Sequence, residues 1–151
     1  MQINKFNVRV YGILINDLGK VLVSDELIKG NKITKFPGGG LEFGEGTIEC
    51  VKREFIEETN NHIEVVEHFY TTDYFQASAY NHEHQIISIY YLVKPISNFL
   101  ITTTEKIFDF KNDLQYAQTF RWMDVRSISE KDFTLPIDKK VGEMLKKGNP
   151  Y

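Results

Sequence analysis

Residues 38–61 read GGGLEFGEGTIECVKREFIEETNN, and this stretch organises the rest of the chain. It opens with three glycines and places six glutamates between positions 42 and 58. On a helix at about 100° per residue, Glu54, Glu57 and Glu58 share one arc. An apolar stripe runs beside that arc and consists of Ile48, Val51, Phe55 and Thr59. Like charges at this spacing repel each other, so we expect a ligand that offsets the repulsion, and hard divalent cations such as Mg²⁺ prefer oxygen ligands of this kind.

The spacing of these charged residues resembles the sequence motif of the Nudix hydrolase family. Here Gly39 is followed by five residues and Glu45, and seven more residues lead to the run REFIEE at positions 53–58. All the fixed charged positions of the family motif are matched. So many fixed positions make this motif strong where most short motifs are weak.

Three positions differ from the family motif. Phe55 is aromatic where an aliphatic residue is usual, Asn60 replaces a glycine, and Asn61 replaces an aliphatic residue. The replaced glycine would end the helix with a positive φ, and Asn tolerates that conformation at a cost well under ~1 kcal/mol relative to Gly. Ile63 can supply the missing aliphatic anchor. The departures therefore affect the loop after the helix and leave the carboxylates in place.

The resemblance implies a fold, a reaction and a cofactor. The fold is α/β, an α/β/α sandwich with a mixed central sheet. The reaction is hydrolysis of a diphosphate linkage in a nucleoside diphosphate joined to another group, with Mg²⁺ or Mn²⁺ as cofactor. Divalent cations neutralise the charge of the phosphates and activate a bound water.

The resemblance also assigns roles to the charged residues. Glu54 and Glu58, one helical turn apart, are expected to hold a cation, and Glu57 either joins them or accepts a proton from the water. The carbonyl of Gly39 and the carboxylate of Glu42 are further expected ligands, although a plain turn is the alternative for the glycines. Arg53 is expected to pair either with Glu57, at i,i+4, or with Glu45, and either pairing would hold the carboxylates in place.

The general base has two candidates, a glutamate of the motif or a carboxylate on a distant loop. For the second, Glu83 is the best choice outside the motif, because His82 and His84 flank it. The alternative is that this segment is a mobile polar loop. Two histidines at i,i+2 with no third ligand are weak support for a metal site.

Substrate-binding residues should lie outside the motif. Arg9 stands in an otherwise apolar first strand and is able to bind a phosphate bidentately or to face solvent at an edge. Aromatic residues suited to stacking on a base are Tyr91 and Trp122, with Tyr74, Phe75 and Phe120 as others. The alternative for these aromatic residues is an ordinary place in the core.

Length and composition set further bounds. The 151 residues suggest a single domain over 1–151, and 42% hydrophobic with 26% charged residues is ordinary for a globular protein. The net charge of −3 gives no basic field for duplex nucleic acid. A single cysteine, Cys50, favours a reducing, cytoplasmic setting, and we expect neither a signal peptide nor a membrane span. Family members often form homodimers, but no residue pattern here marks an interface.

The pattern along the chain is mixed α/β. Strands are expected over residues 6–15, 20–25, 33–36, 63–75, 86–93 and 118–125. A turn at 16–19 should join the first two strands as a hairpin, residues 27–32 should form a loop, and 102–104 a further strand or turn. Helical segments are expected over about 48–59 with Thr47 as N-cap, over 128–132 with Ser127 as cap, and over about 137–147 after Pro136.

Two other functions compete with hydrolysis. A non-catalytic domain of the same fold could bind a nucleotide as a sensor, although such a binder has less need of three carboxylates. An isomerase of isoprenoid diphosphates would need a reactive cysteine. Cys50 lies inside the expected helix near the glutamates, where its thiol pKa should be raised rather than lowered.

Overall fold

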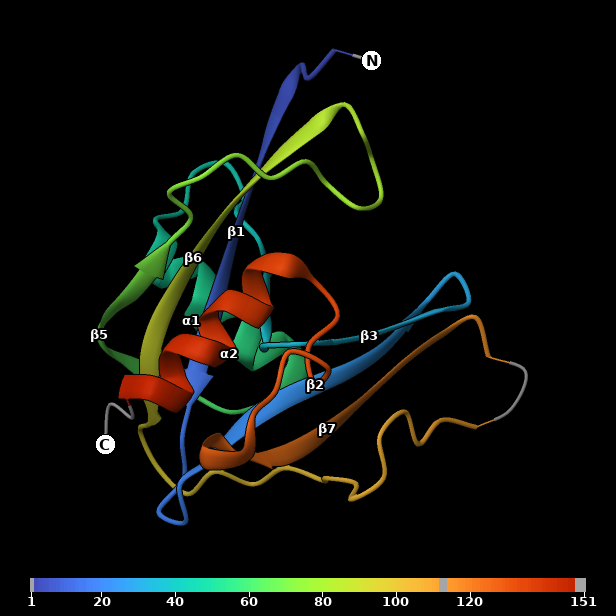
Figure 1. Cartoon of the computed structure of the whole chain (residues 1–151). Coiled ribbons are helices and arrows are strands. Elements are labelled where there is room, and N and C mark those ends of the chain that lie inside the picture. The colour runs from blue at the N-terminus through green and yellow to red at the C-terminus, as the bar shows by residue number, and fades with distance from the viewer. Residues whose placement is uncertain (1, 112–113, 149–151) are drawn as a thin grey trace. The chain divides into compact units, whose positions relative to one another are not determined.

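The computed structural model describes residues 2–111 and 114–148. The chain forms two compact units, the first made of Met1–Ile13 with Gly38–Phe99 and the second of Leu14–Pro37 with Leu100–Tyr151. The chain therefore passes from one unit to the other three times. Figure 1 labels both helices and every strand except β4 (Gly38–Gly40).

The first unit is built on a four-stranded sheet with the strand order β4-β1-β6-β5. Its strands are β1 (Lys5–Leu14), β4 (Gly38–Gly40), β5 (Ile63–Thr71) and β6 (His84–Pro95). β1 pairs antiparallel with β4, and β5 pairs antiparallel with β6. The colour sequence in Figure 1 shows β1 and β6 running in the same direction, so this sheet is mixed, as predicted.

Helix α1 (Thr47–Thr59) belongs to the same unit and packs on this sheet. It buries Cys50, Val51 and Phe55. Gly12 of β1 makes the close packing possible, because an added Cβ there would lie 2.9 Å from Cζ of Phe55. The predicted apolar stripe is wrong at one end, since Ile48 is exposed and Cys50 is buried instead.

The second unit contains a three-stranded antiparallel sheet with the order β3-β2-β7. Its elements are β2 (Lys20–Ile28), β3 (Asn31–Lys35), β7 (Tyr116–Asp124), the 3-10 turn η1 (Val125–Ser127) and helix α2 (Pro136–Gly148). Asp25 is fully buried in this sheet and accepts hydrogen bonds from Thr34 Oγ1 at 2.8 Å and Arg121 Nη2 at 3.0 Å. A buried carboxylate needs such partners, so this ion pair fixes the three strands to one another.

The two predicted helices at 48–59 and 137–147 are confirmed, and the turn at 16–19 is confirmed by a hydrogen bond from Gly19 N to Asn16 O. The predicted hairpin is wrong, because β1 and β2 belong to different sheets and only Ile15 and Val21 form a bridge. Thr47 is not the N-cap of α1. Gly46 takes that place, and Glu49 accepts a hydrogen bond from its N–H.

Several loops and strand ends also differ from prediction. β2 and β3 meet at a tight turn in which Lys29 and Gly30 have positive φ, so most of the predicted 27–32 loop is strand. β5 ends at Thr71 rather than at 75, and β6 is longer than predicted. Residues 102–104 form only one bridge, Thr103 to Phe120. The helical turn lies at Val125–Ser127 with Asp124 as its cap, not at 128–132. No helix in the described part of the chain is long and apolar enough to cross a membrane.

Candidate functional site

Glu54 lies in the middle of α1 and points at the glycine strand β4. Its side chain is only 15% exposed. A Cβ added at Gly39 would lie 2.6 Å from Cδ of Glu54, so the carboxylate occupies the space that any other residue would fill at position 39. Glycine at that position therefore lets a helix carboxylate lie directly against the strand backbone.

Glu58, one turn further along α1, is directed to the same strand. It accepts a hydrogen bond from the backbone N–H of Gly38 at 3.0 Å. Glu57 lies on the outer side of the helix and is 56% exposed. The helical spacing thus places two carboxylates at the glycine strand and a third toward solvent, on the arc predicted from the sequence.

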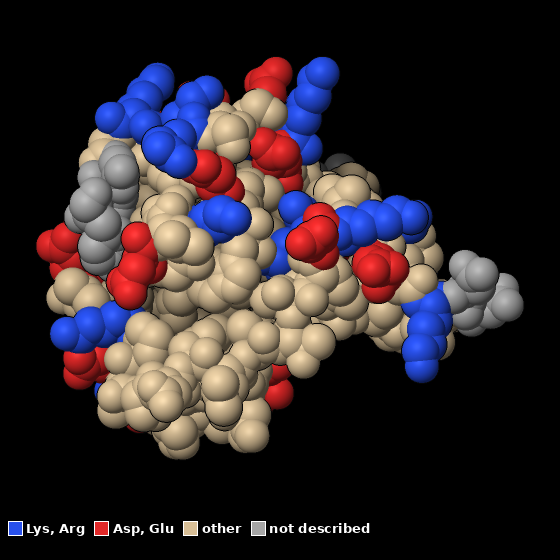
Figure 2. Space-filling view, turned by 90° about the horizontal axis from the view of Figure 1, so that it is seen from below, with Lys and Arg blue, Asp and Glu red and all other residues tan. Residues whose placement is uncertain are grey.

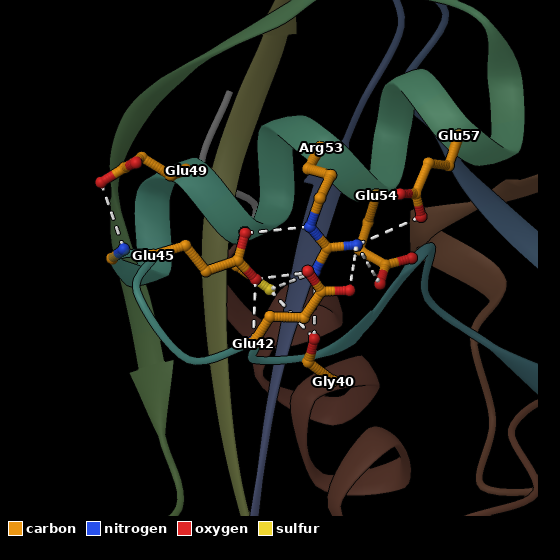
Figure 3. Close-up of polar contacts among 9 residues, drawn as sticks. Gly40, Glu42, Glu45, Glu49, Arg53, Glu54 and Glu57 are labelled. Carbon is orange, nitrogen blue, oxygen red and sulfur yellow. Dashed lines mark hydrogen bonds and ion pairs between the residues drawn. The ribbon is translucent and has the colours of Figure 1, made fainter.

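Arg53 lies at the centre of the acidic residues, as Figure 3 shows. Its Nη1 is 3.1 Å from Glu54 Oε1, 3.1 Å from Glu57 Oε2 and 3.7 Å from Glu42 Oε1. Its Nε and Nη2 donate to the two oxygens of Glu45 at 2.9 and 2.7 Å. The two pairings left open by the sequence, with Glu45 and with Glu57, are therefore both present.

The loop before α1 positions Glu42 and Glu45. Glu42 N donates to Glu45 Oε1 at 2.9 Å, and Gly44 supplies the positive φ, 88°, that the tight turn requires. Glu45 is 12% exposed on its side chain, whereas Glu42 is 66% exposed. The loop thus holds Glu45 firmly under Arg53 and leaves Glu42 accessible at the edge of the cluster.

Charges in this cluster are strongly coupled. Hydrogen bonds from the Arg53 guanidinium lower the pKa of Glu45 to about 2, and the same contact raises the pKa of Arg53 above its ordinary value. Burial raises the pKa of the Cys50 thiol to about 12. The raised thiol pKa confirms the prediction for Cys50 and gives no support for a reactive cysteine.

The donor chemistry of the cluster fits Mg²⁺ or Mn²⁺. The side chains are carboxylates, which these hard cations prefer, and Gly39 lets the carboxylate of Glu54 lie directly against the backbone of β4. In the described part of the chain no three His, Cys, Asp or Glu residues are arranged to hold a metal ion. Four of the carboxylates converge on the Arg53 guanidinium instead, namely Glu42, Glu45, Glu54 and Glu57.

The helix C-terminus confirms another prediction. Asn60 has φ 56° and ψ 30°, the left-handed conformation, and its N–H donates to Ile56 O. Asn61, which replaces an aliphatic residue of the motif, is buried and donates from Nδ2 to Thr59 O at 2.7 Å. Ile63 is buried directly afterwards. The loop thus closes the helix in spite of its departures from the motif.

Glu83, the candidate base outside the motif, lies on an exposed loop of the first unit. Its N–H donates to Asn81 Oδ1 at 3.1 Å, and its carbonyl accepts from Asn4 N. His84 Nε2 is 3.2 Å from Asn81 Nδ2. These contacts are those of an ordered polar loop, and the role of Glu83 as base stays a prediction.

The predicted substrate-binding residues are spread over both units. Arg9 lies opposite Gly40 in the β1–β4 pair and donates from Nε to Tyr11 Oη at 2.7 Å. Tyr91 Oη lies 2.6 Å from Thr47 Oγ1, at the start of α1. Trp122 belongs to β7 of the second unit and pairs with Leu22. Substrate contacts by these three residues remain predictions.

Sequence reasoning missed the backbone partners of the cluster. The carbonyl of Gly40 accepts from Arg53 Nη2 at 3.1 Å and from Cys50 Sγ at 3.5 Å. The N–H of Gly38 is the partner of Glu58. The glycine run was the available signal, but the hydrogen bonds of the folded strand are needed to show which of its backbone groups face the helix.

The face shown in Figure 2 carries both basic and acidic side chains. They are interspersed there, which agrees with a net charge of −3.

Comparisons with known proteins agree with this geometry. The family model described as NUDIX domain matches residues 5–144. A solved structure of a NUDIX hydrolase from Nitrosomonas europaea is 22% identical in sequence and has a TM-score of 0.69. The match covers 96% of this chain and 91% of the Nitrosomonas chain. A MutT protein from Methanosarcina mazei Go1 is 16% identical, with a TM-score of 0.69 over 100% of both chains.

An ADP-ribose pyrophosphatase from Streptococcus suis is 12% identical with a TM-score of 0.58 and covers 96% of this chain and 92% of its own. No sequence among curated proteins matches the chain. The structural likenesses confirm the predicted α/β fold.

Proposed function

The chain belongs to the Nudix family, whose members hydrolyse phosphoanhydride bonds, and on this premise we propose that it is a metal-dependent enzyme cleaving the diphosphate of a nucleoside diphosphate joined to a second group. The single observation that carries the proposal is the placement of Glu54. Its carboxylate lies against the backbone of Gly39, and Arg53 ties it to Glu57, Glu45 and Glu42. Partly buried ion pairs of this kind add little to stability, so the cluster favours a functional role for these carboxylates.

Glu54, Glu57 and Glu58 would hold the divalent cation, with Glu42 and the Gly39 carbonyl as additional oxygen donors. When bound, the cation would neutralise phosphate charge and activate a water for attack on phosphorus. Glu57 is the most accessible carboxylate on the helix arc and is suited to accept the proton of that water. Glu45 does not bind the cation but keeps Arg53 in place through two hydrogen bonds.

The substrate class follows from the family and from the charge of the protein. The Streptococcus suis neighbour is named an ADP-ribose pyrophosphatase, and ADP-ribose is a nucleoside diphosphate joined to a second group. A net charge of −3 makes a cation necessary to bridge an anionic diphosphate to the acidic site. Arg9, Tyr91 and Trp122 are the residues we propose for substrate contacts.

The proposal is tested by assaying release of nucleoside monophosphate and of the phosphorylated second group over a panel of nucleoside diphosphate derivatives with Mg²⁺, Mn²⁺ or EDTA. We expect turnover that EDTA abolishes. Glu58→Gln removes a charged ligand at nearly constant shape and should lower kcat about 100-fold or more, since metal charge stabilisation is worth several kcal/mol. Glu64→Gln, an exposed glutamate of β5 paired with Lys94, is the matched control and should stay within about twofold.

Two outcomes would reject this function. Full activity of Glu58→Gln would show that the helix carboxylates do not carry the reaction. Thermal stabilisation by a nucleotide without any turnover would favour a nucleotide sensor instead. A cytoplasmic location and a homodimer are also proposed, and light scattering of the purified protein would test the dimer.

A further inference from the structure

Arg53 has two sides that meet the acidic cluster in different ways. One side, Nε and Nη2, binds Glu45 at 2.9 and 2.7 Å and the carbonyl of Gly40 at 3.1 Å. The other side, Nη1, is shared among Glu54, Glu57 and Glu42 at 3.1, 3.1 and 3.7 Å. Figure 3 shows the guanidinium between these two sets of oxygens.

The two sides differ in strength. The contact with Glu45 is a fork of two charge-assisted hydrogen bonds to a carboxylate that is 12% exposed, which is the strong geometry for such a pair. The Nη1 contacts are shared among three carboxylates, and two of these, Glu57 and Glu42, are 56% and 66% exposed. Ion pairs open to solvent are weak, so Nη1 is the side that gives way first.

We propose that Arg53 is an exchangeable counter-ion: Nη1 neutralises Glu54 and Glu57 when no divalent cation is bound, and cation binding displaces Nη1 while Nε and Nη2 stay on Glu45. This inference rests on the proposed metal dependence and goes beyond it. The same oxygens, Glu54 Oε1 and Glu57 Oε2, are the partners of Nη1 and the proposed donors to the cation. A cation bound through these oxygens would compete with Nη1 for them, and its higher charge would favour the cation.

The exchange accounts for two features of the cluster. The carboxylates repel one another at i,i+3 and i,i+4, and Arg53 offsets that repulsion in the metal-free protein. Within the described residues no three such side chains are grouped to hold a metal ion, and Glu54 and Glu57 contact Nη1 while Glu58 contacts the N–H of Gly38. Arg53 is thus a positioning residue, which keeps the carboxylates together until a cation replaces Nη1.

The first test compares melting temperatures of the wild type and Arg53→Lys in EDTA and in saturating MnCl₂, without nucleotide. Lysine keeps the charge but has no fork and cannot contact both sets of oxygens. The variant should lose stability in both media, because it lacks the fork to Glu45 in each, and should lose more in EDTA, because only the metal-free state also depends on Nη1. The rise in melting temperature caused by Mn²⁺ should therefore be larger in the variant, by about 2–4 °C, the shift expected for one interaction in a domain of this size.

Arg126→Lys is the matched control. Arg126 forms a similar contact with Asp124, with Nη2 3.0 Å from Oδ2, and is 79% exposed. It should leave the Mn²⁺-induced rise unchanged. If Arg53 only supports the bound metal, its replacement will make the rise equal or smaller, and that result overturns the proposal.

The second test uses the wild-type protein, so it does not depend on whether the variant folds. In ¹⁵N-detected or ¹⁵N-edited spectra of the guanidinium groups, Mg²⁺ addition should shift the Nη1 resonance of Arg53 and leave its Nε–H resonance nearly unchanged. Nη1 and Nε signals that both stay constant while Mg²⁺ binds would overturn the exchange alone. Absence of any Mg²⁺ or Mn²⁺ binding at millimolar concentration would overturn the proposed metal dependence as well.

Discussion

Neighbouring glycines of β4 serve different purposes at the scale of single residues. Gly39 has no positive φ, and the nearest neighbours of an added Cβ would be the carboxylate atoms of Glu54. Gly38 has φ 146°, and an added Cβ there would lie 2.7 Å from the backbone Cα of Tyr11. A side chain can move away from a new methyl group more easily than a paired strand can.

Alanine at position 39 should therefore mainly lower activity, whereas alanine at position 38 should mainly lower stability. Gly39→Ala should displace the Glu54 carboxylate and lower kcat about 100-fold, because a misplacement of about 1 Å has effects of that size. Its stability should change little, since Ala also restricts the unfolded chain. Gly38→Ala should instead lower the free energy of unfolding by about 2 kcal/mol or more. Hydrolysis assays and urea unfolding of both variants check this, and equal stability losses would contradict it.

The Glu45–Arg53 pair should make stability depend on pH. The pKa of Glu45 is lowered in the folded protein from 4.5 to about 2. Its contribution is therefore complete above about pH 4.5, falls as the pH drops toward about 2, and is absent below that. We expect Glu45→Gln to lower the urea midpoint at neutral pH and this difference from wild type to shrink between about pH 4.5 and 2. A difference that stays constant down to pH 2 would contradict the pairing.

At the scale of elements, the C-terminus of α1 depends on Asn60. Its φ of 56° is strained for most residues and natural for glycine. Asn60→Ala should lower the free energy of unfolding by about 1 kcal/mol, and Asn60→Gly should raise it by a few tenths. Calorimetry should show these changes as a fall of about 2–4 °C and a small rise. A stabilised Ala variant would contradict the left-handed cap.

The elements that sequence predicted well contain their own signals. Helix α1 has an amphipathic period inside it and Asn60 at its end, and α2 begins at Pro136. Strand β4 was missed because its three glycines have poor strand propensity, and it exists only because β1 supplies its hydrogen bonds. The predicted β1–β2 hairpin was wrong because the pairing of each strand also depends on distant parts of the chain. Local patterns reveal a turn at 16–19 but not the sheet that each flanking strand joins.

The candidate site divides along the same line. Glu54, Glu57 and Glu58 were predictable together because helix spacing alone brings them to one arc. That Arg53 pairs with Glu45 as well as with Glu57 was not predictable, since the pairing with Glu45 depends on the turn that Gly44 allows before the helix. The backbone groups of Gly38 and Gly40 carry no side-chain signal at all. Trp122, by contrast, was placed by sequence on a strand and is found on β7.

At the scale of the whole molecule, the chain crosses between its two compact units three times. The segment Leu14–Pro37, which belongs to the second unit, separates the two parts of the first unit in the sequence. The segment Gly38–Phe99, which belongs to the first unit, separates the two parts of the second. Neither unit is a continuous stretch of chain, so each must close a long loop to form, and that closure has an entropic cost. Folding of the other unit restricts the conformations of that loop and so lowers this cost. We therefore expect the two units to unfold together, as the predicted single domain over residues 1–151 requires.

The chain contains a natural probe for each unit. Trp122 is its single tryptophan and lies in the second unit, whereas Cys50 is its single cysteine and is buried in the first. In a urea titration, Trp122 fluorescence should report the second unit, and the labelling rate of the Cys50 thiol should report the first. We expect one common midpoint, because coincident transitions from different probes are the mark of two-state unfolding. If Cys50 became reactive at a urea concentration where Trp122 still reported a folded environment, the first unit would open independently, and the acidic cluster would be lost before the rest of the protein.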